Sequence, residues 1–124
     1  MFGSGLPGRR CLPFKDADES LRDIADAIGM IEAFTSGMDF EEFRQGPKTV
    51  AAVERKRLII SEAAIRLGSD AETRCPGLLW RDIRGMGNWL RHQYDRIELP
   101  TIWKTVQGDL PPLKTAVLLA LDRA

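Results

Sequence analysis

The stretch at residues 48–67 reads KTVAAVERKRLIISEAAIRL and carries a helical pattern over its whole length. Its apolar side chains recur every three or four residues, which places them on one helix face: Val50, Val53, Ile60, Ala64 and Leu67. The charge run Glu54-Arg-Lys-Arg57 inside it is expected to be a solvated face, with a contact to a partner or a phosphate as the alternative. This stretch predicts a long amphipathic helix that other helices must cover.

Helical patterns continue upstream of this stretch. A helix is expected from Asp16 to Gly37, with inward-facing side chains at every third or fourth position: Leu21, Ile24, Ala25, Ile28 and Ile31. Asp39 is expected to open a short segment, residues 40–43, that docks as a lid over the core.

Downstream, the sequence predicts a loop from Gly68 to Gly77 and then a helix that begins at residue 78 or 79. We expect Leu99-Pro100 to break this helix and residues 101–106 to form a short helical piece. Gly108-Asp109 should start the last helix, with Asp109 as its cap, Pro111 and Pro112 in its first turn, and three side chains packed inward: Val117, Leu118 and Leu121. No segment alternates like a strand, so the chain is predicted to be an all-α, up-and-down four-helix bundle with short accessory helices.

Composition narrows the class of protein. The chain has 124 residues, which is enough for one domain. We expect this domain at residues 16–124, after a flexible leader at residues 1–15. The alternative for the leader is a basic arm that contacts a phosphate backbone through Arg9, Arg10 and Lys15. Lys+Arg and Asp+Glu are 18 each, which excludes a protein that coats nucleic acid through its overall charge. Two cysteines and one histidine are too few for a structural zinc site, and no cofactor or metal is expected. No membrane-spanning or secretory segment is evident, so the cytoplasm is the expected location.

The stretch WRDIRGMGNWLRHQY, residues 80–94, concentrates the residues that can carry chemistry. It holds the only histidine, the only tyrosine, two of the three tryptophans and three arginines. In the window from Arg74 to Lys104 basic residues outnumber acidic ones by six to three. This local excess predicts a surface that binds RNA or phosphate, through Arg81, Arg84 and Arg91.

On a helix, Arg84, Asn88 and His92 share one face because they are spaced four residues apart. A neutral imidazole can take a proton from a hydroxyl, guanidinium groups can hold a phosphate, and Asn88 can orient the imidazole or bind a phosphate oxygen. These groups are sufficient for metal-independent cleavage of RNA, in which the 2′-hydroxyl attacks its own phosphodiester. The alternative is a helix-end histidine satisfied by a carbonyl or carboxylate.

Gly85 and Gly87 each cost a helix about 1 kcal/mol relative to alanine. Their presence suggests that another backbone comes close, most simply the helix of a second copy. Trp80, Trp89 and Trp103 are expected to anchor the core or an interface, with base stacking as the alternative.

Short motifs occur in a set order along residues 20–122 and together resemble one family. They are Leu21-Arg-Asp-Ile24, Phe40-Glu-Glu-Phe43, the stretch Lys48–Arg55, Ile60-x-Glu62-Ala-Ala64, the run Trp80…Ile83-x-Gly85-Met86-x-Asn88-x-x-x-His92-x-Tyr94, and Leu110-Pro-Pro-Leu113. This ordered set resembles the DUF86 group of HEPN domains, the HepT-like toxins.

The resemblance implies a HEPN-type bundle that dimerises and brings two copies of the motif to one cleft. Family members are typically ribonuclease toxins encoded beside a small nucleotidyltransferase antitoxin of the MntA type. The family motif Arg-x4-His-x-Tyr maps the histidine to His92, the tyrosine to Tyr94 and the polar residue after the arginine to Asn88. Since the antitoxin can adenylylate the tyrosine, Tyr94 is the implied modification site.

This chain departs from the motif at Gly87, where the family has arginine. Arg84, one turn earlier, or Arg91, beside His92, could hold the phosphate instead. Besides a toxin ribonuclease, two readings stay open: an inert HEPN module that binds a nucleotidyltransferase and is adenylylated on tyrosine, and a helical homodimer whose glycine-rich helix serves packing alone. Tyr94 lies about 200° around an ideal helix from His92, so it can also be a core tyrosine.

Overall fold

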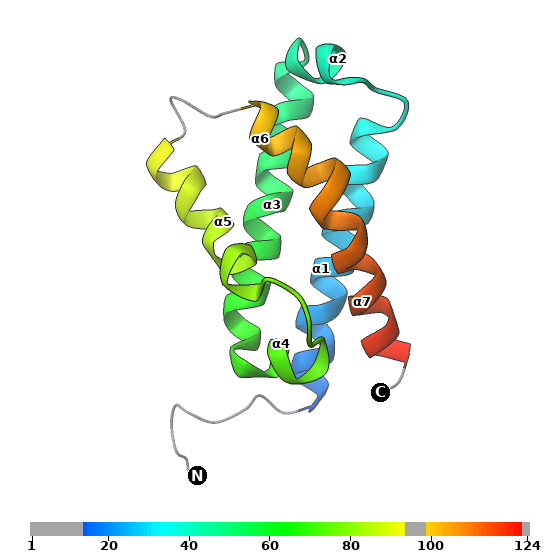
Figure 1. The fold of residues 1–124 in the computed structure, drawn as a ribbon, viewed down its shortest axis with the longest axis vertical. Helices are drawn as coiled ribbons and strands as arrows, with labels where there is room; N and C mark the ends of the chain where they lie inside the picture. Colours follow the sequence, from blue (N-terminus) through cyan, green and yellow to red (C-terminus); the bar gives the residue numbers. More distant parts are fainter. Residues whose placement is uncertain (1–13, 94–98, 123–124) are drawn as a thin grey trace.

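The computed structural model describes residues 14–93 and 99–122, with side chains described for 16–86 and 99–122. Four long helices run alternately up and down the molecule (Figure 1): α1 (Phe14–Thr35), α3 (Pro47–Leu67), α5 (Trp80–Gln93) and α7 (Leu110–Asp122). The short helices α2 (Phe40–Arg44), α4 (Ser69–Arg74) and α6 (Leu99–Lys104) lie between them. The described residues contain no strand, and the all-α four-helix prediction is confirmed.

The helix starts agree closely with the sequence pattern at the N-terminal end. Helix α1 begins at Phe14, two residues before the expected domain start at Asp16. The rest of the expected leader, residues 1–13, lies outside the described part of the chain.

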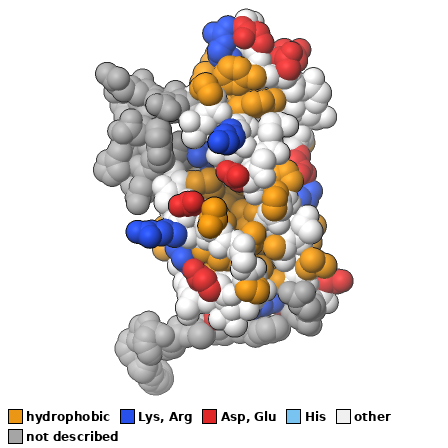
Figure 2. Space-filling view, in the orientation of Figure 1, with side chains coloured by type: hydrophobic (Ala, Val, Ile, Leu, Met, Phe, Trp, Pro, Cys, Tyr) orange, Lys and Arg blue, Asp and Glu red, His pale blue; other side chains and the backbone are white. Residues whose placement is uncertain are grey.

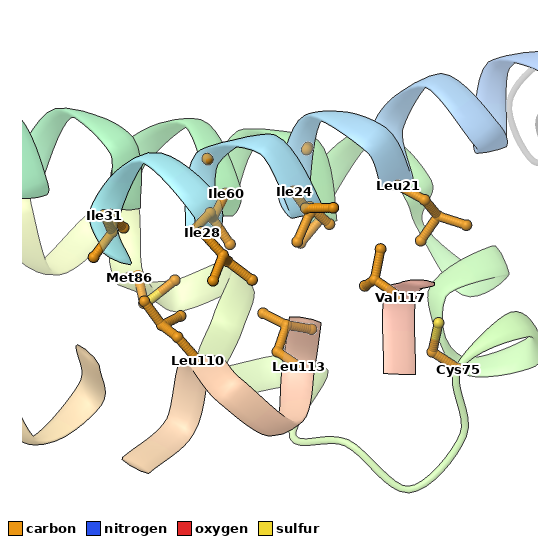
Figure 3. Close-up of a cluster of buried hydrophobic side chains, with 14 of the residues drawn as sticks. Leu21, Ile24, Ile28, Ile31, Ile60, Cys75, Met86, Leu110, Leu113 and Val117 are labelled. Carbon is orange, nitrogen blue, oxygen red and sulfur yellow. The ribbon is translucent and has the colours of Figure 1, made fainter. Parts of the chain in front are cut away.

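The core lies where α1, α3 and α7 meet, and α3 packs between α1 and α5. Figure 3 shows the α1 side chains facing those of α3 and α7 in one buried cluster: Leu21, Ile24, Ile28, Ile31, Ile60, Leu110, Leu113 and Val117. These side chains are at most 1% exposed, apart from Leu110 at 2%. The inward faces predicted for α1 and α3 are therefore confirmed.

The lid segment forms as predicted. Asp39 caps α2 with a reciprocal pair of hydrogen bonds, in which Glu42 N donates to Asp39 Oδ1 (2.8 Å) and Asp39 N donates to Glu42 Oε1 (3.0 Å). Phe43 is fully buried, and its ring centroid lies 5.0 Å from that of Trp103. Helix α2 thereby closes the end of the bundle against α3 and α6.

The loop predicted from Gly68 to Gly77 is wrong for residues 69–74, which form helix α4. Gly68 does end α3, with a φ of +55° that favours glycine. The chain then turns back into helix at once because Ala71 has a fully buried place against the core. Two acidic side chains in the first turn of α4, Asp70 and Glu72, also suit a helix start.

The C-terminal part is one continuous helical run rather than two separate pieces. Leu99 and Pro100 begin α6 instead of only breaking the preceding helix, and a π-helical turn, Thr105–Asp109, joins α6 to α7. The predictions that Gly108-Asp109 starts a helix and that Asp109 caps it are therefore wrong. Pro111 and Pro112 do stand in the first turn of α7. They cannot donate to the carbonyl groups four residues earlier, so a wider turn there costs little.

The register of α7 also differs from the prediction. Its buried side chains are Leu110, Leu113, Val117 and Ala120. Val117 packs inward as expected and Leu121 is partly buried, but Leu118 is 46% exposed, so its predicted inward position is wrong.

The charge run at residues 54–57 is not a single solvated face. Arg55 is exposed, whereas Glu54 and Arg57 are buried and form an ion pair with each other. The expectation fails because residues 54 and 57 lie on the part of α3 that faces its neighbours, not on its outer side.

None of the helices in the described ranges is long and apolar enough to cross a bilayer.

Figure 2 shows one face of the molecule, where apolar side chains reach the surface in a hollow between α5 and the α6–α7 run, among scattered charged groups.

Replacing Phe43 with alanine should lower the free energy of unfolding by about 3 kcal/mol, because a fully buried aromatic ring is lost from the lid. Urea denaturation followed by circular dichroism measures this. Phe40→Ala is the control, since Phe40 is only partly buried on the same helix. A loss below about 1 kcal/mol for Phe43→Ala would mean that the lid does not stabilise the bundle.

Candidate ribonuclease site on helix α5

The first half of α5 is fixed on its neighbours by buried contacts. Trp80, 2% exposed, donates from Nε1 to the carbonyl oxygen of Cys75 at 2.9 Å. One turn later, Ser61 Oγ on α3 donates to the carbonyl oxygen of Arg84 at 2.6 Å. The predicted anchoring role of Trp80 is confirmed. The hydrogen bond from Ser61 fixes the position of α5 along the length of α3.

Arg84 ties α5 to the end of α3 and to α4. Its Nη2 donates to the carbonyl oxygen of Gly68 (2.8 Å) and its Nε to that of Ala64 (3.4 Å). Its Nη1 and Nη2 also donate to the two carboxylate oxygens of Glu72, at 2.9 and 2.7 Å. The last carbonyl groups of a helix lack partners within it, so this guanidinium gives Ala64 a donor near the end of α3. Gly68, just after α3, accepts from Arg84 in addition to the backbone N–H of Ala71.

The same contacts set the charge state of the pair. Hydrogen bonds from Arg84 lower the pKa of Glu72, and the hydrogen bonds to Glu72 raise the pKa of Arg84. Both groups are therefore charged at neutral pH.

This arrangement directs the guanidinium of Arg84 toward α4, whereas positions 88 and 92 lie one and two turns further along α5. To hold a phosphate beside those positions, Arg84 would have to leave Glu72 and the two carbonyl groups. Its role as a phosphate clamp stays a prediction, and in this protomer it is a structural tie.

Apart from Arg81, the remaining predicted residues lie on or beyond the second half of α5. The helix continues without interruption to Gln93, so Asn88, Arg91 and His92 stand on helical backbone, with positions 88 and 92 one turn apart. Their side chains, like that of Trp89, are outside the described set, as is all of Tyr94. Arg81 is exposed on the first turn of α5. The proposed roles of these residues stay predictions.

Gly85 has no packing reason within the protomer. A methyl group at this position would meet nothing within 4 Å. Since glycine weakens a helix by about 1 kcal/mol relative to alanine, the described contacts give no reason for a glycine at this position.

Within the described ranges, no group of three or more His, Cys, Asp or Glu side chains is placed to hold a metal ion.

The sequence analysis missed two ion pairs, Arg84–Glu72 between α5 and α4 and Glu54–Arg57 within α3. The Glu72–Arg84 pair was missed because residues 69–74 were predicted to be a loop, whereas they form helix α4. The Glu54–Arg57 pair had a detectable signal, because Arg57 follows Val53 by four residues and precedes Ile60 by three, which places it on the apolar stripe of α3.

Replacing Arg84 with alanine should lower the free energy of unfolding by about 1–2 kcal/mol, because the hydrogen bonds that Arg84 donates to the carbonyl oxygens of Ala64 and Gly68 are lost. The carbonyl oxygen of Gly68 keeps its bond from Ala71 N. The exposed Arg81 on the same helix gives the matched control, and Arg81→Ala should change stability by less than about 0.5 kcal/mol. Equal effects of the two variants would refute the structural role of Arg84.

The contribution of Glu72 depends on pH. Because its pKa is lowered in the folded protein, its stabilisation is complete above the ordinary value of 4.5 and disappears as the pH falls through the lowered pKa. The difference in melting temperature between wild type and Arg84→Ala should therefore shrink between neutral pH and about pH 3. It should not vanish, because the bonds to the carbonyl groups do not titrate. A difference that stays the same would contradict the Glu72 contact.

Comparison with known proteins places this chain in a family. The family model described as "Ribonuclease HepT-like" matches residues 24–119. A protein of Thermococcus cleftensis named "Probable ribonuclease HepT" is 40% identical over 94 residues, which cover 76% of this chain and 86% of the relative. "Putative RNase MJ0125" of Methanocaldococcus jannaschii is 31% identical over 103 residues, 83% of this chain and 89% of the relative. No solved structure matches the chain. The motif order, the four-helix fold and these matches agree, and the chain belongs to the ribonuclease HepT-like family.

Proposed function

We propose that this protein is the toxin of a HepT-type toxin–antitoxin pair, which cleaves cytoplasmic RNA at the cleft of a homodimer without a metal ion. The observation that carries the proposal is the family match across a motif helix, α5, whose positions 88 and 92 stand one turn apart. The relatives named as ribonucleases support the RNA substrate.

The cleavage needs a base, an acid and a cation at the phosphate. The base takes the proton of the 2′-hydroxyl, whose oxygen then bonds to phosphorus; the bond from phosphorus to the 5′-oxygen breaks, and the acid gives that oxygen a proton. The products are a 2′,3′-cyclic phosphate and a free 5′-hydroxyl. We assign the proton transfers to His92, the orientation of the imidazole to Asn88 and the charge at the phosphate to Arg91.

A dimer answers the need for two proton-transferring groups. The chain has a single histidine, so one imidazole cannot begin the reaction as base and act as acid at the same moment. Two copies of α5 at one cleft supply two imidazoles. Gly85, open on α5, and the apolar hollow beside α5 in Figure 2 both favour a contact between two copies at this helix.

The purified protein should cleave single-stranded RNA in the presence of EDTA and leave 2′,3′-cyclic phosphate ends. His92→Ala should lower the rate by at least about a hundredfold, the usual contribution of a general acid or base. Gel analysis of labelled RNA with end-group mapping measures both. Cleavage that requires a divalent cation, or that His92→Ala retains, would overturn the proposal.

Gly85 provides the test of the dimer. Gly85→Gln should leave the protomer folded, because the new side chain meets open space, but it should block the second copy and convert the dimer to a monomer. Gly29, in the middle of α1, also has nothing within 4 Å, and Gly29→Gln is the matched control that should remain dimeric. Light scattering after size exclusion reads the mass, and a Gly85→Gln dimer would exclude α5 from the contact.

The second candidate function rests on Gly87, which replaces the arginine of the family motif. In this alternative the protein is an inert module that binds an MntA-like nucleotidyltransferase and is adenylylated on Tyr94. RNA cleavage by the Gly87→Arg variant distinguishes this alternative from the ribonuclease proposal. If the protein is an inert module, the wild type should not cleave RNA, and Gly87→Arg should create that activity. If the wild type cleaves RNA, adenylylation of Tyr94 by the partner and ATP should inhibit it, since added negative phosphate repels an RNA backbone.

A further inference from the structure

Helix α3 carries a second apolar stripe on its outer side, besides the one that lines the core. Ala51, Leu58 and Ile65 are spaced seven residues apart and therefore lie along one line of the helix. Ala51 is exposed, Leu58 is half-buried and Ile65 is 57% exposed. Apolar side chains at this spacing are typical of a helix that packs lengthwise against another helix.

The stripe borders the motif helix α5. Ser61 marks the direction of α5, because its hydroxyl bonds to the backbone of that helix at Arg84. With 100° per residue, Ala51, Leu58 and Ile65 stand about 40–80° around α3 from Ser61. The stripe therefore lies on the outside of the bundle, along the α5 side of α3.

Two opposite charges run beside this stripe. Arg55 and Glu62 are exposed, and they stand seven residues or about 10 Å apart along the helix, which is too far for a pair with each other. Arg66, one turn after Glu62, is paired with Asp23 of α1. Neither Arg55 nor Glu62 makes an ion pair within the part of the chain that the structure describes, and Arg81, exposed at the start of α5, does not pair with Glu62 there.

The stripe and the two charges are complementary to a second copy of themselves. In a two-fold contact between α3 helices that run in opposite directions, each residue meets the one equally far beyond the axis. With the axis beside Leu58, Ala51 of one copy lies opposite Ile65 of the other, so a small side chain meets a large one. Arg55 of each copy lies opposite Glu62 of the other. One arrangement thus matches both the sizes and the charges.

This contact also brings the two copies of α5 together. A two-fold axis perpendicular to the paired helices keeps both copies of a neighbouring helix on the same side of the pair. Helices α3 and α5 run in opposite directions (Figure 1), and Ser61 is level with Arg84, so Leu58 is level with Gly87. The axis therefore passes near the middle of α5, within one turn of Gly85, where a side chain would meet open space.

We propose that two copies of this chain pack α3 against α3 in opposite directions, with Leu58 on the two-fold axis. This contact is the floor of a cleft whose walls are the two copies of α5. The inference rests on the proposed ribonuclease function, which needs two copies of α5 at one cleft, and it names the surface that holds them there.

Reversal of one charge tests the contact. Arg55→Glu places like charges opposite each other on both sides of the axis, so the dissociation constant of the dimer should rise about tenfold or more. Arg55 has no acidic residue three or four positions away in its own helix, so the protomer should keep its helical circular dichroism. Sedimentation velocity over a concentration series measures the dissociation constant.

A charge exchange gives the decisive comparison. Arg55→Glu/Glu62→Arg should restore the wild-type dissociation constant, because the two charges have changed places and attract again. Recovery in the double variant cannot come from a defect in folding. Arg22→Glu is the matched control, since it reverses an exposed arginine on α1 and should leave the dimer unchanged. Arg55→Glu and Glu62→Arg variants that dimerise like the wild type overturn the proposal.

The apolar stripe has its own test. Ile65→Lys should weaken the dimer, because a side chain that is 57% exposed in the protomer becomes covered in the contact. Leu119→Lys on α7 is the matched control, because Leu119 is 52% exposed and lies outside the contact. Equal dissociation constants for these two variants contradict the proposal.

The same measurements separate this contact from the proposed function. If the dimer depends on Arg55 and Glu62 but the wild type does not cleave RNA, the proposed function falls and the contact stands. If the wild type cleaves RNA as a dimer that Arg55→Glu leaves intact, the contact falls and the function stands. A monomeric wild type overturns both the contact and the dimer cleft.

Discussion

The bonds that Arg84 makes to the backbone at the end of α3 are the constraint on which the site depends. Arg84 supplies donors to Ala64 and Gly68 from the neighbouring helix, and Glu72 holds the same guanidinium in place. Three helices, α3, α4 and α5, are thereby joined at one point. From that point α5 runs back along α3, and this sets the height at which positions 88 and 92 stand beside the bundle.

The long helices could be predicted from the sequence because their apolar positions repeat with the period of a helix. Asp39 marked the start of the short helix α2, and Gly68 marked the end of α3. Helix α4 and the π turn could not be predicted in this way. A six-residue helix such as α4 is too short for its apolar residues to repeat with a helical period. A π turn depends on which backbone hydrogen bonds are absent from the surrounding helix, and the sequence pattern does not specify this.

The candidate site was located from the sequence in part. The stretch on α5 was singled out by its residue types and spacing, whereas the family followed from the resemblance of the ordered motifs, which the family match confirms. The use of Arg84 did not, because a guanidinium that suits a phosphate suits helix carbonyl groups and a carboxylate equally well. Glu54 and Arg57 were predicted to be exposed because four consecutive charged residues were treated as one surface. On a helix, consecutive residues point in different directions, and Arg57 shares the buried face of Val53 and Ile60. The roles of Asn88, Arg91 and His92 depend on contacts between side chains, which spacing alone does not specify.

The turn at Thr105–Asp109 makes the length of this part of the chain critical. A π turn contains about one residue more than an α turn, so everything before it is rotated by about 100° relative to a regular helix. Trp103, which precedes the turn, has its ring centroid 5.0 Å from that of Phe43. Side chains within the turn are mostly exposed and can vary, but deletion of a single residue there would swing the indole off the phenyl ring and uncover the far end of the bundle. Homologues that keep this aromatic contact should therefore differ here by substitution and not by insertion or deletion.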